Sequence, residues 1–132
     1  MILLDTNVLI HFLKGWSPVV EKVSAAPSQE LAISSVTRYE LEFGALQMVP
    51  AKRKIVHDLC ADLQQIPFDE AAALEAAQIR KDLSAKGQVI GPLDLLIAGS
   101  ARSRGAVLVT GNTREFARVK GLRCEDWTVP GR

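Results

Sequence analysis

Short runs of apolar residues alternate along the chain with longer segments in which apolar residues recur every three or four positions. A short continuous run predicts a strand buried on both faces, and a longer periodic segment predicts a helix. The expected strands are residues 2–4, 31–33, 66–68 and 106–109, with a strand-like stretch at 122–124. The expected helices are 8–14, 17–25, 36–49, 51–64, 70–85, 93–103 and a short one around 115–117. This alternation predicts an α/β fold with a mainly parallel sheet covered by helices on both faces.

Proline and glycine mark the ends of several of these segments. Pro50 stops one expected helix, and Gly87 and Gly105 close two others. Pro67 makes 66–68 an edge strand, because proline lacks the N–H that an inner strand donates to its neighbour.

The composition is that of one globular domain. With 132 residues, 48% of them hydrophobic and 23% charged, the chain can build a sizeable core, and extensive disorder is excluded. No apolar run approaches the roughly 18 residues of a membrane span, and the amino terminus lacks a signal-peptide pattern. Cys60 and Cys124 lack the spacing of a metal site, and a core of this size needs no disulfide. We therefore expect a single cytoplasmic domain over residues 1–132 with reduced thiols.

Charge is balanced overall but uneven along the chain. A formal net charge of +1 gives no strong positive field, which argues against general nucleic-acid binding by the whole surface. In residues 102–123, however, Glu115 is the only acid among six cations. These cations are Arg102, Arg104, Arg114, Arg118, Lys120 and Arg123. They predict either a basic patch that binds backbone phosphates or an ordinary solvated surface.

The most informative acids are those that interrupt apolar surroundings, because a lone buried carboxylate is costly unless it is paired or metal-bound. Asp5 directly follows the first expected strand. In a parallel sheet the reactive site lies beyond the carboxyl ends of the strands. Asp5 is therefore either a helix N-cap or a ligand at this edge.

Glu40 and Glu42 lie two positions apart on the same expected helix and so point in different directions. Glu40 shares its face with apolar Val36 and Phe43, whereas Glu42 has Arg38 one turn before it. Glu42 is thus expected to form a surface ion pair, and Glu40 is the unusual acid.

Asp94 lies in the first turn of the expected helix 93–103. It shares a face with Ile97, Ala98 and Ala101, all small or apolar. The helix dipole alone would favour an acid at this position, so a structural role stays open.

The polar turn 110–115 after the clearest strand adds Asn112 and Glu115, between which spacing alone does not choose. Three acids on separate elements near strand ends suggest a carboxylate cluster. Their repulsion would be severe without a cation, and oxygen ligands suit Mg²⁺ or Mn²⁺. A divalent metal without a His, Cys or Ser nucleophile favours phosphodiester hydrolysis.

The same residues carry a family resemblance that spans nearly the whole chain. Residues 2–7, Ile-Leu-Leu-Asp-Thr-Asn, resemble the opening strand of PIN domains. Residues 33–44 around Glu40 and 90–98 around Asp94 resemble the second and third acidic motifs of that family. Residues 108–116, followed by 121–127, look like the ending of VapC toxins and are closest to the branch that cleaves initiator tRNA in the anticodon stem-loop.

The resemblance implies a three-layer α/β/α PIN domain and a Mg²⁺-dependent endoribonuclease, with Mn²⁺ as an alternative metal. It implies Asp5, Glu40 and Asp94 as the metal-binding and catalytic acids. Many PIN domains have a fourth acid where this chain has Asn112, which leaves Glu115 as the substitute. It also implies the toxin of a bacterial type II toxin–antitoxin system, a homodimer whose RNA substrate is expected to be tRNA. Its partner would be a VapB-like antitoxin that places a basic side chain in the acidic site.

Three other classes are less consistent with the sequence. A haloacid-dehalogenase-type phosphatase needs Asp-x-Asp after its first strand, and position 7 is Asn7. A signalling receiver domain needs paired acids near the first strand and an acceptor Asp after a middle strand, which are not found. A catalytically inactive PIN-fold binding module is disfavoured because Asp5, Glu40 and Asp94 are all present.

Overall fold

The computed structural model describes residues 1–130, whose strands form one five-stranded sheet in the order β3-β2-β1-β4-β5. All four neighbouring pairs are parallel. The strands are β1 (Ile2–Leu4), β2 (Leu31–Ser34), β3 (Gln64–Ile66), β4 (Val107–Val109) and β5 (Arg123–Glu125). The order reverses between β1 and β4, the place where the carboxyl ends of such strands leave a crevice.

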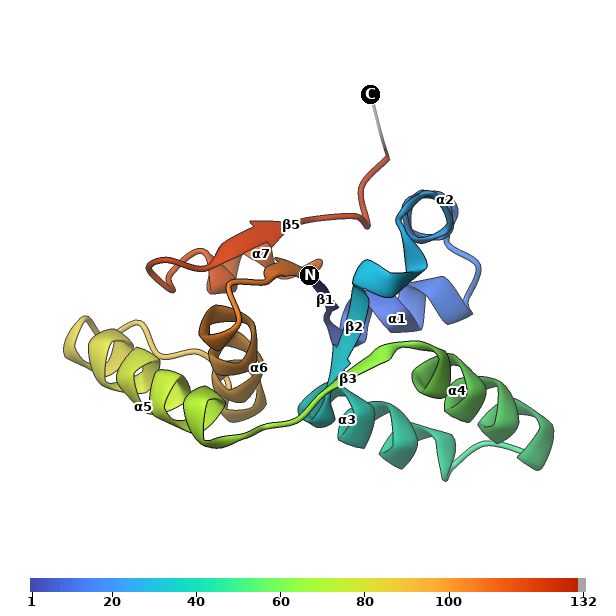
Figure 1. Ribbon diagram of the computed structural model, residues 1–132, viewed down its shortest axis with the longest axis horizontal. Coiled ribbons are helices and arrows are strands. Elements are labelled where there is room, and N and C mark those ends of the chain that lie inside the picture. Colours follow the sequence, from blue (N-terminus) through green and yellow to red (C-terminus); the bar gives the residue numbers. More distant parts are fainter. Residues whose placement is uncertain (131–132) are drawn as a thin grey trace.

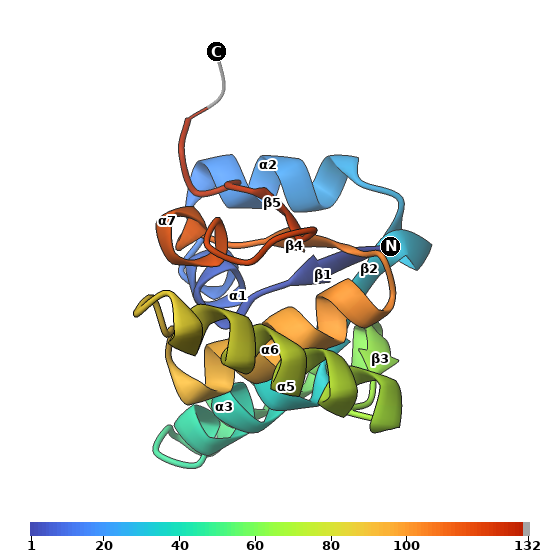
Figure 2. The same ribbon diagram turned by 90° about the vertical axis from the view of Figure 1, so that its left-hand side faces the viewer.

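Helices cover both faces of this sheet. They are α1 (Thr6–Leu13), α2 (Ser17–Ala25), α3 (Ser35–Ala45), α4 (Pro50–Asp62), α5 (Glu70–Ala85), α6 (Pro92–Ser103) and α7 (Thr113–Phe116), with a short 3-10 helix at Ser28–Glu30. Figure 1 shows α5 and α6 on one side of the sheet and α1 to α4 on the other. Figure 2, turned by a right angle, has α5 and α6 in front of the strands. The expected three-layer α/β/α architecture is confirmed.

Alternating side chains of the short strands feed two separate cores. Leu3 of β1 and Leu108 of β4 face the α5–α6 side, whereas Leu4 and Val109 face the opposite side. All four are buried, as expected for inner strands of a parallel sheet. The first core adds buried side chains from α5 and α6, including Ile79, Leu83, Leu95 and Ile97. The second adds buried side chains from α1 to α4, including Val8, Val19, Leu41 and Cys60.

Helices α5 and α6 approach each other closely at Gly99. A Cβ atom at this position would lie 2.7 Å from the Ala72 carbonyl oxygen and 2.7 Å from the Ala76 Cβ. Any larger side chain at position 99 would therefore force the two helices apart. Because α6 carries Asp94 in its first turn, this contact also fixes the position of a candidate site residue.

The sequence predicted most elements within a few residues, but two boundaries were wrong. Helix α3 ends at Ala45 and not at residue 49, because Pro50 starts α4 and proline disfavours helical backbone in the residue before it. Strand β3 covers Gln64–Ile66, so Pro67 follows the strand. The polar and exposed Gln64 and Gln65 gave no apolar signal, although β3 is an edge strand as predicted.

Two further observations concern the chain as a whole. No helix within residues 1–130 is both long enough and apolar enough to cross a membrane. Cys60 is buried in the core, as its apolar neighbours predicted, and both it and Cys124 are free thiols.

Candidate active site

A pocket of about 260 Å³ lies at the carboxyl ends of β1 and β4. Its lining residues are Asp5, Thr6, Asn7, Ile10, Glu40, Asp94 and Asn112. We call it the acidic pocket. Four of the five predicted site residues therefore meet there, from β1, α3, α6 and the turn after β4. The fifth, Glu115, does not line the pocket.

Asp5 is a helix N-cap, one of the two roles that the sequence left open, and it also lines the acidic pocket. Its Oδ1 accepts a hydrogen bond from the Thr6 backbone N–H at 2.8 Å and so caps α1. Its Oδ2 accepts one from the Thr110 hydroxyl at 2.8 Å and one from the Asn7 side-chain amide at 3.1 Å. Three donors from two strand ends thus hold one carboxylate at the edge of the pocket.

Opposing effects act on the pKa of the Asp5 carboxyl group. The residue is only 3% exposed, and this burial is the main cause that raises the pKa of its carboxyl group. The hydrogen bonds from Thr110 and Thr6 lower the pKa, and the negative charge of Glu40 raises it again. The surrounding donors therefore support a charged form that burial opposes.

Glu40 is held from the α1 side. The Thr6 hydroxyl donates to Glu40 Oε1 at 2.7 Å and lies 3.2 Å from the Thr37 hydroxyl. Thr37 in turn is fixed because its backbone N–H donates to the Ser34 hydroxyl at 3.0 Å, which caps α3. One oxygen of Glu40 is thus occupied by Thr6.

Glu40 does not lie on a buried apolar face of α3, contrary to what its sequence neighbours had predicted. Phe43, expected on a buried face with Glu40, is 59% exposed, so this face of α3 is not covered within residues 1–130. Glu40 is half-buried because it reaches Thr6, not because apolar neighbours enclose it. The contrast with Glu42 is confirmed, since Glu42 forms an ion pair with Arg38 at 3.5 Å.

Asp94 carries the most perturbed carboxyl group of the acidic pocket. Burial is the largest cause, and together with the negative charges of Asp5, Glu115 and Glu40, in that order, it raises the pKa of Asp94 to about 6. Among residues 1–130 no hydrogen bond offsets these effects. Four carboxylates therefore repel one another here, and a positive charge in the pocket would relieve the repulsion.

The turn after β4 separates the roles of Asn112 and Glu115. Asn112 lines the acidic pocket, and its side-chain amide donates to Glu115 Oε2 at 3.2 Å. Glu115 thus lies behind Asn112, orients its amide, and acts on Asp94 through its charge.

Sequence reasoning missed the contribution of Thr110. Its side chain is fully buried, donates to Asp5, and accepts the Asn112 backbone N–H at 3.0 Å. Asn7 links the same turn, because its Oδ1 accepts the Gly111 backbone N–H at 2.8 Å. A Cβ at Gly111 would lie 3.2 Å from that oxygen, so a small residue suits this close approach. The sequence contained one indication of this role, because Thr110 is a polar residue directly after the buried strand β4.

The donor set of the pocket suits a hard cation. It offers carboxylate, hydroxyl and amide oxygens and no sulfur or imidazole, which is the chemistry that Mg²⁺ and Mn²⁺ prefer. Within the described residues, no three His, Cys, Asp or Glu side chains lie close enough together to form a ready-made ion site. The carboxylates thus line one pocket and affect one another through their charges, but they do not converge on a single position for an ion.

The chain is similar to known proteins over nearly its whole length. The PIN domain family model matches residues 2–122. The chain is 41% identical over 128 residues to the tRNA(fMet)-specific endonuclease VapC of Shigella flexneri, which covers 96% of this chain and 97% of the relative. It is 39% identical over 127 residues to the protein of the same name from Salmonella typhimurium strain LT2, covering 95% and 96%.

A solved structure is similar over the same span. The DNA-bound VapBC complex from Salmonella typhimurium contains a chain that matches with a TM-score of 0.89 and 38% identity. The match covers 96% of this chain and 97% of that one. The sequence and the fold of this chain therefore match the same family over nearly its whole length.

Proposed function

The chain belongs to the PIN-domain family, and from this premise we propose that its acidic pocket is the centre of a metal-dependent endoribonuclease that acts on tRNA. The chain is a VapC-type ribonuclease, the toxin of a toxin–antitoxin pair. One observation supports the acidic pocket as the catalytic centre. Asp5, Glu40 and Asp94, from three separate elements, face a single pocket at the carboxyl edge of the sheet.

Asp5 and Asp94 would hold the metal ion, which we propose to be Mg²⁺ with Mn²⁺ as the alternative, and Glu40 would add its negative charge to the same site. A bound ion would supply Lewis-acid stabilisation of the charge that develops on the phosphate and favour ionisation of the attacking water. The like-charge repulsion that raises the pKa of Asp94 supports this assignment, because a cation relieves it.

Glu40 orients the attacking water and accepts its proton. The Thr6 hydroxyl occupies Oε1 of Glu40, which leaves Oε2 free to act as the base. The water oxygen attacks the phosphorus in line, and the bond from phosphorus to the 3′ oxygen breaks. The products are a 5′-phosphate and a 3′-hydroxyl, whose oxygen takes up a proton from solvent. Asn112 supports the site at its rim, and Glu115 supports Asn112.

The substrate we infer is initiator tRNA, cut in its anticodon stem-loop. The support is the similarity to two relatives named tRNA(fMet)-specific endonucleases, which extends over more than nine-tenths of the chain. A basic turn close to the acidic pocket adds support, because Arg114 and Arg118 flank Glu115 in the sequence.

A VapB-like antitoxin is the partner, and an apolar groove next to the acidic pocket is the surface we assign to it. This groove of about 430 Å³ lies between α1 and the α3–α4 pair, and it shares Ile10 and Glu40 with the acidic pocket. An antitoxin segment in the groove could place a basic side chain among the carboxylates. Ile55→Asp should then weaken neutralisation by the antitoxin without slowing cleavage. The matched change Leu74→Asp, at an equally exposed leucine on α5, should do neither.

The working unit we propose is a cytoplasmic homodimer of one PIN domain per chain, residues 1–132. Its support is a row of exposed apolar side chains on and after α3, where Tyr39, Phe43 and Leu46 are 60%, 59% and 69% exposed. Light scattering after size exclusion should show a dimer that Phe43→Lys converts to a monomer.

The direct test of function is cleavage of a labelled total tRNA pool by antitoxin-free protein. We expect discrete products with Mg²⁺, none with EDTA, and none with Asp5→Asn. Asp62→Asn, an equal change at an exposed carboxylate at the end of α4, should cleave like the parent protein. Products with a cyclic phosphate would exclude attack by water. No cleavage of tRNA or ribosomal RNA by folded protein would favour a PIN-fold binding module instead.

A further inference from the structure

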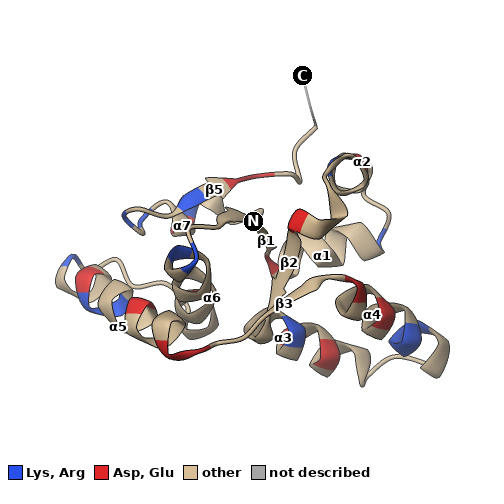
Figure 3. Ribbon diagram, viewed as in Figure 1, with Lys and Arg blue, Asp and Glu red and all other residues tan. Residues whose placement is uncertain are grey.

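A second polar cavity, which we call the basic pocket, lies between the carboxyl-terminal half of α5 and the turn before β5. Its volume is about 330 Å³. Four cations and one acid line it, namely Lys86, Arg102, Arg118, Lys120 and Asp82. Figure 3 shows basic segments on α5, on α6 and in the loop before β5, which are the three elements that border this cavity.

The floor of the basic pocket is apolar and rigid. It consists of Ile79 and Leu83 from α5 and of Val119 from the turn, which are 1%, 2% and 3% exposed. Phe116, fully buried three residues before Val119, fixes the same turn in the core. Residues 118 and 120 therefore project from an anchored segment.

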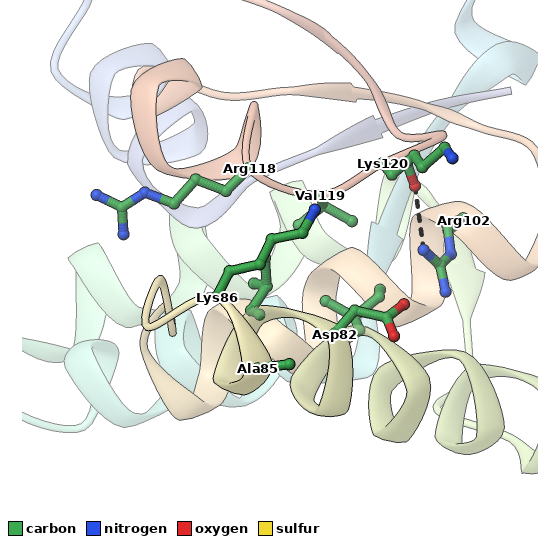
Figure 4. A pocket seen from close by; sticks show the side chains of 9 residues that line it. Asp82, Ala85, Lys86, Arg102, Arg118, Val119 and Lys120 are labelled. Atoms are coloured by element: carbon green, nitrogen blue, oxygen red, sulfur yellow. Dashed lines mark hydrogen bonds between the residues drawn. The ribbon is translucent and has the colours of Figure 1, made fainter.

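The turn is also tied directly to α6. Arg102 Nη1 donates to the Lys120 carbonyl oxygen at 3.1 Å, and Arg102 Nε forms an ion pair with Glu75 at 2.6 Å. Figure 4 shows Arg102 beneath Lys120 on one side and Lys86 reaching toward Val119 on the other, with Asp82 between them. The Arg118 guanidinium extends outward in the same view. The contacts of Arg102 thus hold the turn to α6, and Lys86 lies across the cavity from Arg102.

Most of this positive charge is uncompensated. Within residues 1–130, Lys86, Arg118 and Lys120 form no ion pair, and only Arg102 has an acidic partner. The single acid of the lining, Asp82, accepts a hydrogen bond from Gln78 and not from a cation. An anion is the ligand that this arrangement favours.

Helix dipoles explain part of the arrangement but not all of it. Lys86 follows the carboxyl end of α5 and Arg102 lies in the last turn of α6, where cations are favoured. Arg118 and Lys120 belong to the turn after α7. Because α7 has only four residues, its dipole gives little stabilisation to positive charges at this place. Helix dipoles therefore do not account for Arg118 and Lys120, and Lys86 has no ion-pair partner within residues 1–130 that would keep it from a ligand.

The basic pocket lies within reach of a nucleic-acid strand that occupies the acidic pocket. Asp94 and Arg102 are eight residues apart on α6, which corresponds to about 12 Å along a helix axis. Glu115 and Arg118 are linked more directly, because the Arg118 N–H donates to the Glu115 carbonyl at 3.1 Å. A strand of a few nucleotides covers such a distance.

We propose that the basic pocket binds a backbone phosphate of the RNA substrate, a few nucleotides from the bond that is cleaved. The inference rests on the proposed ribonuclease function and names a second point of contact for the same substrate. Phosphate contacts of this kind position a nucleic acid without reading its sequence. The pocket therefore sets affinity and register, and the acidic pocket supplies the chemistry.

The test uses the full chain with Asp5→Asn, so that RNA is bound but not cut. Lys86→Glu and Lys120→Glu are combined, and the affinity for labelled tRNA is measured over a range of salt concentrations. We expect at least about tenfold weaker binding, and a slope of log affinity against log salt that is smaller by roughly 1.4 to 1.8 for two lost contacts. The matched control combines Lys22→Glu with Lys81→Glu, two exposed lysines outside the pocket.

The outcomes separate this inference from the function on which it rests. In the background with intact Asp5, the pocket variant should raise KM for tRNA and leave kcat unchanged. If the pocket and control variants bind tRNA equally, or if only duplex DNA binding falls, the inference is overturned while cleavage by the parent protein still supports the function. If the parent protein neither binds nor cuts any RNA, both fail.

Discussion

The two ends of α6 border pockets of opposite charge. Asp94 in its first turn belongs to the acidic pocket, and Arg102 in its last turn belongs to the basic pocket. In the acidic pocket, like charges are kept together in half-buried surroundings, with hydrogen bonds from Thr6 and Thr110 holding two of them in place. In the basic pocket, Lys86 and Lys120 are exposed cations.

This difference separates chemistry from positioning. Crowded carboxylates oppose folding, so their presence indicates selection for a reaction. Exposed cations add little to stability and repel one another only weakly through water. Loss of a carboxylate from the acidic pocket should therefore impair catalysis and preserve or increase stability, whereas changes of the exposed Lys86 and Lys120 in the basic pocket should alter binding alone.

The sharpest test of this contrast is Asp94→Asn. Cleavage should fall by about 10²- to 10³-fold, because a ligand that stabilises charge in the transition state is lost. The metal-free protein should gain about 1 kcal/mol in unfolding free energy after discounting for solvent screening. Burial of a charge, and then repulsion from neighbouring carboxylates, raise the pKa of Asp94, and the neutral amide avoids both costs. Single-turnover cleavage and urea unfolding measure the two effects. Loss of both activity and stability would make Asp94 a structural helix-capping residue.

Thr110→Val tests the donors that hold Asp5. The substitution keeps the shape and removes the 2.8 Å hydrogen bond, so cleavage should fall by about tenfold. The pKa of Asp5 should rise further because a bond that lowers it is gone, and the acid limb of the pH–rate profile should move to higher pH. Thr113→Val in the same turn is the control. An unchanged pH profile in the Thr110 variant would show that Thr110 only fills space.

The sequence predicted those features that are encoded locally. The Ala- and Leu-rich segment 70–85 is α5 as expected, and Asp5, Glu40 and Asp94 were recognisable because each adjoins a strand end or an apolar helix face. Contacts between distant residues could not be predicted. Thr110 and Asp5 are 105 positions apart, and no local pattern indicates that they meet.

The basic residues near the end of the chain show more clearly that the sequence does not predict contacts between distant residues. The sequence grouped six cations between residues 102 and 123, but the structure separates them. Arg104 forms an ion pair with Asp69 at 3.1 Å, and Arg123 donates to the Gly105 carbonyl at 2.9 Å. Lys86 joins the pocket from another helix. The packing of α5, α6 and the turn before β5 against one another brings the cations of the pocket together.

Arg102→Met should affect binding less than the double charge reversal but should also cost stability. It removes the ion pair with Glu75 and the hydrogen bond to the Lys120 carbonyl, which together are worth about 1 kcal/mol of unfolding free energy. The loosened turn should weaken tRNA binding by about threefold. Arg104→Met, which loses the ion pair with Asp69 outside the basic pocket, should leave binding unchanged. Equal binding by both variants would mean that the turn needs no tether.

The smallest expected effect is the pH dependence of stability in the metal-free protein. The folded-state pKa values of Asp5 and Asp94 are raised above the usual 3.8, with Asp94 at about 6, so the folded protein binds more protons than the unfolded chain between these values. Stability therefore increases as the pH falls through about 6, by less than about 1 kcal/mol for Asp94 after discounting for screening. Urea unfolding at pH 7.5 and pH 5 should show this increase in the parent protein. It should be smaller in Asp94→Asn and unchanged in Lys86→Gln with Lys120→Gln, because these neutral substitutions alter no carboxyl group of the acidic pocket. An equal pH effect in all three proteins would place its origin outside the acidic pocket.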